Sequence, residues 1–286
     1  MLTSLKSDEV YAATNILSGG DVVVKFRHLD MGRALQHEYR IQKALASGIG
    51  IPRVWWFGTD FGIEAFVMDR MGPSLECLLS QKHSHKFPVV TVAGIGRQLV
   101  SCRTCWPSCA DSSQLHQISL LEFVHSRNLI HRHLKPSHIL TGAKRSDLIL
   151  IDFGLARAYR DKRTHRHIAY KRQATFAGSQ YFSSLRALRG QGQSRRDDLE
   201  SVAYILIYFL CGALPWQNYQ CTTDVIQSKA DFHQSSLSDP VPPEFFSLLV
   251  YARSLAFDAR PDYHLLRSYF DRFCTDALTA ANWGDI

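Results

Sequence analysis

Two different periods of hydrophobic residues divide the chain. In its first part, short β-branched runs between turn residues predict four strands, at Glu9–Thr14, Asp21–Phe26, Val54–Gly58 and Ile63–Met68. The turn signal Ser18-Gly19-Gly20 separates the first two runs and predicts a hairpin. Apolar residues at helical spacing among charged ones predict an amphipathic helix over Arg33–Ala46.

The helical period dominates after Gly72-Pro73. Strand-like residues occur there only around Leu148–Ile151, and no internal repeat or low-complexity linker divides the chain. The pattern therefore predicts an α+β fold with two lobes in one domain over residues 1–286. The small β-rich lobe is expected over about 1–70 and the larger helical lobe over about 71–275.

One segment interrupts a predicted helix. The helical spacing of Val92, Ile95 and Leu99 is lost over Val100–Gln117, which includes a proline. If that segment is left out, Leu121 falls four places after Leu99 and the apolar face continues. Val100–Gln117 therefore has the character of an insertion within a single helix.

Two origins are open for this insertion. It has features of an unspliced intron, since its first two residues, Val-Ser, can be encoded by GTAAGT and Gln117 by CAG. A transcript with no shorter spliced form would contradict this hypothesis. Alternatively, Cys102, Cys105 and Cys109 have a spacing that suits tetrahedral zinc, with His116 as the nearest fourth ligand.

Composition indicates a folded domain. Of the 286 residues, 45% are hydrophobic, which supports a substantial core and excludes disordered and fibrous classes. No apolar run approaches the ~20 residues that a membrane span needs. The odd number of cysteines, seven, and an amino terminus without signal-peptide character argue against a disulfide framework. We therefore expect an intracellular protein, cytoplasmic or nuclear.

The formal net charge of +7 has two interpretations. It is consistent with a solvated basic surface or with attraction to acidic or phosphorylated protein segments. No basic stripe carries interleaved aromatic residues, so the pattern does not indicate a nucleic-acid partner.

Several short motifs occur in a fixed order. Lys25 ends the run VVVK, and Glu38 lies in the predicted helix that follows it. The loop sequence HRHLKPSH spans His131–His138, and Asp-Phe-Gly follows a strand-like run at Asp152–Gly154. This order resembles the signature set of protein kinases.

Further motifs make the resemblance narrower. The chain is similar to the casein kinase 1 family at Gly72–Glu76, Tyr159–Thr164, Ser194–Ser201, Leu214–Gln217 and Arg260–Tyr263. Like that family it lacks the Ala-Pro-Glu motif, and Ser184-Leu185-Arg186 stands where the family has Ser-Ile-Asn. The resemblance runs from about Val10 to Phe273 and implies a bilobal protein-kinase-like fold.

The resemblance implies a nucleotide site. Lys25 would hold the α- and β-phosphates of ATP, with Glu38 orienting it. Met68 would be the gatekeeper, and Asp69 and Met71 would belong to the hinge that binds adenine.

The resemblance also implies a reaction centre. Asp152 would bind the Mg²⁺ ion that bridges the phosphates, and Lys135 would steady the γ-phosphate. Asp198 would brace the catalytic loop from the helix below it.

The chain departs from the family at two of these positions. His133 stands in place of the catalytic aspartate, and loss of a general base typically costs about 10²–10⁴ in rate. His138 stands in place of the asparagine that is the second metal ligand, and imidazole nitrogen is a poor ligand for Mg²⁺. In the kinase fold these histidines converge with Asp152, and two imidazoles with one carboxylate also suit zinc, iron or manganese.

Two further departures concern binding. Thr3, Leu5 and Asp8 stand where the family has the glycines of its phosphate-covering loop, so we expect an incomplete amino-terminal lobe with weakened ATP and Mg²⁺ binding. Tyr181 replaces an arginine of the family's substrate-side anion site. Basic residues that remain nearby are Arg157, Arg160, Lys162, Arg163, Arg166, Lys171 and Arg172.

Three functional hypotheses follow. The first is a casein kinase 1-like pseudokinase with residual ATP binding. The second is an active serine/threonine kinase that transfers the γ-phosphate to acidic or phosphorylated proteins, with His133 or water in place of the aspartate. The third is a mis-spliced or decaying gene product without a stable fold.

Overall fold

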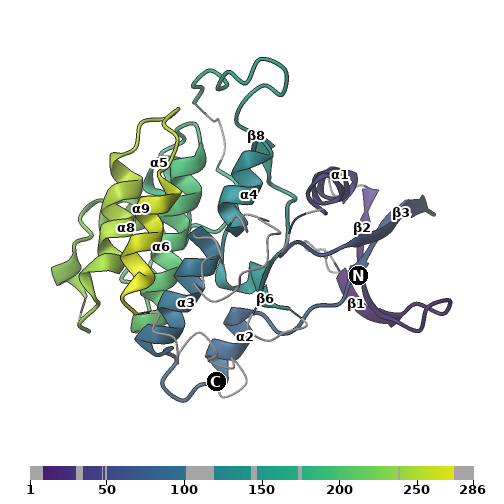
Figure 1. The fold of residues 1–286 in the computed structure, drawn as a ribbon, viewed down its shortest axis with the longest axis horizontal. Coiled ribbons are helices and arrows are strands. Elements are labelled where there is room, and N and C mark those ends of the chain that lie inside the picture. Colours follow the sequence, from purple (N-terminus) through teal and green to yellow (C-terminus); the bar gives the residue numbers. More distant parts are fainter. Residues whose placement is uncertain are drawn as a thin grey trace, which may run out of the picture.

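The computed structural model consists of a β-rich lobe and a helical lobe, joined by the segment after Asp69 (Figure 1). It describes residues 9–29, 35–46, 48, 50–100, 119–142, 147–172, 176–237 and 239–273. The bilobal α+β architecture predicted from the sequence is confirmed.

The small lobe is built on one antiparallel sheet. Its strands are β1 (Glu9–Thr14), β2 (Asp21–His28), β3 (Val54–Asp60) and β4 (Ile63–Asp69). The strand order is β1-β2-β4-β3. The predicted β1–β2 hairpin is present, and Gly19 supplies the left-handed backbone conformation that its turn requires, with φ of 68°.

One helix covers the sheet. Helix α1 (Leu35–Leu45) contacts β3 and β4, and its Leu35 packs with Phe66 and Met68 in a small buried cluster. The register of the sheet places Lys25 of β2 opposite Phe66 of β4. This packing holds α1 against the sheet that contains β2, and Glu38 of α1 forms an ion pair with Lys25 of β2.

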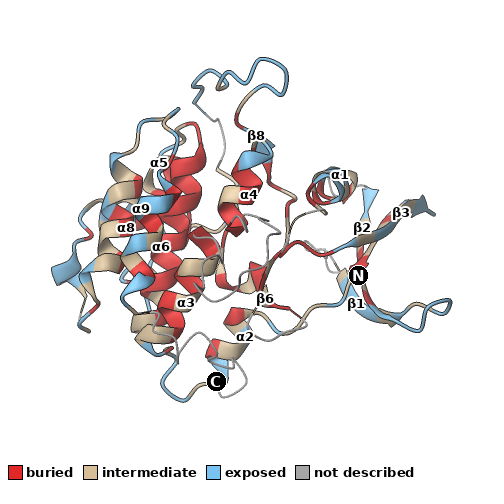
Figure 2. Ribbon diagram, viewed as in Figure 1, coloured by how far each residue is buried: buried red, intermediate tan, exposed pale blue. Residues whose placement is uncertain are grey.

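The large lobe is built around one buried helix. Its helices are α2 (Leu75–Ser80), α3 (Val89–Val100), α4 (Leu120–Ser126), α5 (Leu185–Leu188), α6 (Arg195–Cys211), α7 (Thr222–Ala230), α8 (Pro243–Ser254) and α9 (Tyr263–Asp271), with 3₁₀ turns η2 (Pro136–His138) and η3 (Gln234–Ser236). Helix α6 is buried along almost its whole length, between α3 and α8 (Figure 2). It therefore gives the site a rigid base.

Four short strands complete the lobe. They are β5 (Leu129–Ile130), β6 (Ile139–Thr141), β7 (Leu148–Leu150) and β8 (Arg157–Ala158), paired as β5–β8 and β6–β7. The sequence pattern predicted only β7 among these four strands. The prediction that no other strand follows Gly72 was wrong. Strands of two or three residues are too short to show a period of two.

The predicted insertion lies outside the described residues except at its first position. Val100 is the last residue of α3 and is fully buried. Helix α4 then begins at its own N-cap, because the Ser119 hydroxyl accepts a hydrogen bond from the Glu122 amide at 3.1 Å. Thr3, Leu5 and Asp8 also lie outside the described residues, and within the described ones no helix is both long and apolar enough to span a bilayer.

Replacement of the α4 cap should lower stability. Ser119→Ala removes the acceptor for the Glu122 amide, so we expect a loss of about 1 kcal/mol in the free energy of unfolding. Denaturant titration measures this loss. The control is Ser126→Ala at the exposed end of the same helix, where we expect less than about 0.5 kcal/mol. Equal effects of the two variants would contradict the assignment of the cap.

The first turn of α6 should make stability depend on pH. Asp197 accepts hydrogen bonds from the Ser184 hydroxyl and the Ser194 amide, but its burial raises the pKa of this carboxyl to about 6. Since an unfolded aspartate has a pKa of about 3.9, this contribution to stability is present below about pH 4 and is lost as pH rises through about 6. The loss is at most about 1.4 kcal/mol per pH unit, or roughly 3 kcal/mol in all.

The variant Asp197→Asn isolates the contribution of the Asp197 carboxyl to the pH dependence of stability. As pH rises from 4 to 6, we expect the unfolding free energy of the wild type to fall relative to that of Asp197→Asn. Denaturant titrations at several pH values measure the difference, and Asp224→Asn at an exposed position of α7 serves as the control. Parallel pH profiles of the wild type and Asp197→Asn would contradict the expectation.

Candidate active site

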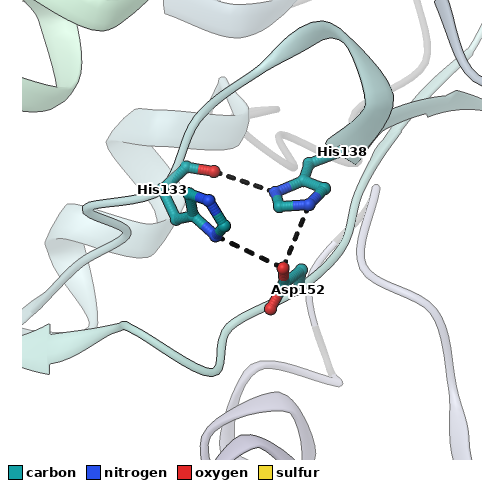
Figure 3. Close-up of side chains that lie close together, drawn as sticks. All are labelled: His133, His138 and Asp152. Carbon is teal, nitrogen blue, oxygen red and sulfur yellow. Dashed lines mark hydrogen bonds and ion pairs between the residues drawn. The ribbon is translucent and has the colours of Figure 1, made fainter. Parts of the chain in front are cut away.

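The candidate site lies where the two lobes meet. The loop after β5 carries His133, and η2 ends at His138. Asp152 follows β7 with φ of 64°, a left-handed conformation that is uncommon for a residue other than glycine. Figure 3 shows both imidazole rings turned toward the Asp152 carboxylate.

An ion pair connects the small lobe to this carboxylate. Lys25 Nζ lies 2.6 Å from Glu38 Oε2, and both side chains are buried. The same ammonium lies 4.0 Å from Asp152 Oδ1. The structure therefore brings together Lys25, Glu38 and Asp152, which the sequence placed far apart.

The two oxygens of Asp152 have different surroundings. Oδ1 faces Lys25 and accepts a hydrogen bond from the Gly154 amide at 3.3 Å. Oδ2 faces the two rings, at 3.4 Å from His133 Nδ1 and 3.0 Å from His138 Nε2. The rings also contact each other edge to face, with centroids 4.6 Å apart.

The electrostatic environment keeps Asp152 ionised. Burial by itself raises the pKa of this carboxyl, but its contacts with His133 and His138 and the charge of Lys25 bring it well below its usual value. Burial lowers the pKa of His138, although the neighbouring carboxylate opposes the shift. His138 Nδ1 donates to the carbonyl oxygen of His133 at 2.9 Å, since a carbonyl can only accept.

His131 positions the loop and has no free ring nitrogen for chemistry. Its Nε2 donates to the Ile151 carbonyl at 3.1 Å, and its Nδ1 accepts from the His133 amide at 3.2 Å. Burial lowers the pKa of His131 to about 4, so the ring is neutral near pH 7. These bonds tie the backbone at His133 to the strand that leads into Asp152.

Asp198 of α6 holds the same loop from below. Its Oδ1 accepts from the Arg132 amide at 2.8 Å, and its Oδ2 accepts from the His131 amide at 2.8 Å and His125 Nε2 at 2.9 Å. Burial raises the pKa of Asp198, but these donors, His125 first, bring it below its usual value. The other nitrogen of His125 contacts the Tyr263 hydroxyl.

The remaining predicted residues lie around the cluster. Met68 is buried at the end of β4, and the Asp69 carboxylate accepts a hydrogen bond from the Trp55 indole at 2.6 Å. Met71 follows β4 in the connection between the lobes, and Lys135 is the residue before η2. Within the described part of the chain, no side-chain hydrogen bond or ion pair joins these four to Asp152.

Sequence reasoning missed the roles of His125, His131 and Tyr263. All three support the loop through contacts between segments that are distant in the sequence. His131 and Tyr263 lie within the motifs that carry the resemblance and His125 does not, but neither context shows which distant residues these side chains contact.

Comparison with known families agrees with this geometry. Residues 106–267 match the family model of the protein kinase domain, which is more than half of the chain. The chain therefore belongs to the protein kinase family. Members of this family use ATP and a divalent metal ion in phosphoryl transfer.

The donors present do not fit Mg²⁺ well. Mg²⁺ prefers oxygen ligands in an octahedron, and this site offers one carboxylate with two imidazoles in contact with it. The ion pair of Lys25 and Glu38, by contrast, suits the phosphates of ATP.

Replacement of Asp198 should loosen the loop. In Asp198→Asn an amide NH₂ must face one of the buried N–H donors, so we expect a loss of roughly 3 kcal/mol in the free energy of unfolding. Hydrogen exchange should also become faster at the His131 and Arg132 amides. The exposed Asp258→Asn is the control. Unchanged exchange at both amides would show that Asp198 does not hold the loop.

Proposed function

We propose that the chain is a casein kinase 1-like protein kinase domain with impaired phosphoryl transfer, a pseudokinase that retains weakened ATP binding. Membership of the protein kinase family supports the broad assignment. The casein kinase 1 type is supported by the motifs at Gly72–Glu76, Ser194–Ser201 and Arg260–Tyr263.

The observation that carries the proposal is the imidazole at position 133. An active kinase has a carboxylate there, which orients the substrate hydroxyl and accepts its proton. His133 has no anionic oxygen, and its Nδ1 lies 3.4 Å from Asp152 Oδ2, so this nitrogen already faces another group. Loss of a general base typically costs about 10²–10⁴ in rate.

Position 138 adds a second impairment. An active kinase has an asparagine there, whose side-chain oxygen is a ligand of the second Mg²⁺ ion. His138 offers a nitrogen in place of that oxygen, and its Nε2 lies 3.0 Å from Asp152 Oδ2. The metal that neutralises the transferring phosphoryl group is therefore poorly held.

The part of the site that binds nucleotide is better preserved. The buried pair of Lys25 and Glu38 remains, and Asp152 keeps Lys25 close. Because a buried lysine that is already held in place loses little freedom on binding phosphate, weak ATP binding is consistent with this geometry.

We further propose that acidic or phosphorylated protein segments are the partners. Between Gly154 and Arg172 the exposed lysines and arginines are Arg157, Lys162, Arg163, Arg166, Lys171 and Arg172. Arg160 is partly buried and donates to Asn128 Oδ1, so its guanidinium group already has a partner within the protein. Clustered exposed cations attract anionic segments, and the attraction weakens with salt.

Restoration of the two family residues tests the proposal. Transfer of labelled γ-phosphate to an acidic protein such as casein should be near background for the wild type. The variant His133→Asp/His138→Asn should transfer at least about 10²–10⁴-fold faster, because it regains the base and the oxygen ligand. The same variant should be compared in a chain that lacks residues 100–117.

Matched controls make the result specific. Lys25→Ala in the restored variant should abolish the gained transfer, since Lys25 holds the phosphates. A wild type that transfers phosphate to serine at ordinary enzymatic speed, in a reaction that Lys25→Ala abolishes, would overturn the pseudokinase assignment in favour of an active serine/threonine kinase.

A further inference from the structure

Three side chains of the candidate site bring their donor atoms close together. The donors of His133, His138 and Asp152 all lie within 4.8 Å of one another (Figure 3). We propose that they form a binding site for a divalent transition-metal ion, with zinc as the ion that the donor set favours and with one coordination position left open.

The separations suit a common ion. Zinc binds imidazole nitrogen and carboxylate oxygen at about 2.0–2.2 Å, so two donors on one ion lie roughly 3.0–3.5 Å apart. His138 Nε2 lies 3.0 Å and His133 Nδ1 lies 3.4 Å from Asp152 Oδ2. Each nitrogen therefore already has the spacing to Asp152 Oδ2 that two neighbouring ligands of one ion have.

The hydrogen bond made by His138 Nδ1 leaves Nε2 of the same ring available as a metal ligand. Its Nδ1 donates to the His133 carbonyl at 2.9 Å, so Nδ1 carries a proton. Its Nε2 is then the nitrogen that faces the Asp152 carboxylate. In the neutral ring that atom presents a lone pair toward an anionic oxygen, a contact that a cation between the two atoms stabilises.

Neighbouring groups hold the ligands in place. The His133 carbonyl fixes the tautomer and orientation of the His138 ring, as outer partners of metal-bound histidines commonly do. Asp152 Oδ1 accepts from the Gly154 amide and faces Lys25, which leaves Oδ2 for the ion. The site is therefore built before the ion arrives.

The donor set selects against the usual kinase metal. Two imidazoles and one carboxylate with an open position suit zinc and related transition ions, whereas Mg²⁺ demands oxygen donors. The side chains of His133 and Asp152 remain 19% and 24% exposed, so solvent and ions reach the site. The open position can take water or a phosphate oxygen.

This inference deepens the proposed function and rests on it. An ion bound by His133 and His138 uses the two positions at which an active kinase has its base and its second metal ligand. Histidine at positions 133 and 138 would thus turn a phosphoryl-transfer centre into a site that binds a transition-metal ion.

Zinc titration of the intact chain by calorimetry, after chelator treatment and in excess Mg²⁺, tests the inference. The titrated protein carries serine at Cys102, Cys105 and Cys109, so that the cysteines of the insertion cannot account for binding. We expect one zinc ion per chain. His133→Asn and His138→Asn should each weaken binding at least as much as loss of an outer partner does, about 10–100-fold. His264→Asn, at an exposed histidine of α9, should leave it unchanged.

The absorption spectrum of the Co²⁺-loaded protein and the melting temperature test whether these three side chains bind the ion. The Co²⁺-loaded protein should show a spectrum with nitrogen and oxygen ligands and no thiolate charge-transfer band. Zinc should raise the melting temperature of the parent protein and of His264→Asn, and should not raise that of His133→Asn or His138→Asn. Absence of zinc binding, or equal binding by His138→Asn, would overturn the inference.

Different results would contradict the metal-site proposal and the pseudokinase proposal. If the protein neither binds zinc nor transfers phosphate, only the metal-site proposal is wrong. Phosphoryl transfer at ordinary speed with Mg²⁺ would remove the pseudokinase assignment.

Discussion

The Asp152 carboxylate is the point on which the site depends. It is the meeting place of both lobes, because Lys25 of β2 lies 4.0 Å from one of its oxygens and the histidines of the helical lobe face the other. A partly buried anion needs such compensation, since removal from water raises its free energy. Any change in its partners therefore changes what the site can bind.

The scaffold beneath this carboxylate is that of a protein kinase, and its loop is held by residues other than the two histidines that face Asp152. Asp198 accepts from the two loop amides, and His131 ties the loop to the residue before Asp152. None of these contacts involves the rings of His133 or His138. The fold can therefore keep the loop in shape while the residues that perform catalysis change.

Much of the fold could be predicted from the sequence, but the state of individual groups could not. The four strands of the small sheet could be predicted from β-branched runs. The pairing of Lys25 with Glu38 could be predicted from the order of the motifs along the chain. The neighbours Asp197 and Asp198 show the limit. The pKa of Asp197 is raised to about 6, whereas that of Asp198 is lowered. Their sequence context is nearly the same, and the hydrogen-bond donors and charges that the fold places around each carboxyl distinguish them.

The histidines at 133 and 138 act as a pair. A single imidazole beside Asp152 would give two donors, which is too few for a stable transition-metal site. Two rings turned toward one carboxylate oxygen give three donors, and the same two histidines stand where an active kinase has its anionic base and an oxygen ligand of Mg²⁺. The proposed loss of kinase chemistry and the proposed metal affinity thus have one physical cause, the presence of nitrogen donors around a carboxylate that the fold holds in place.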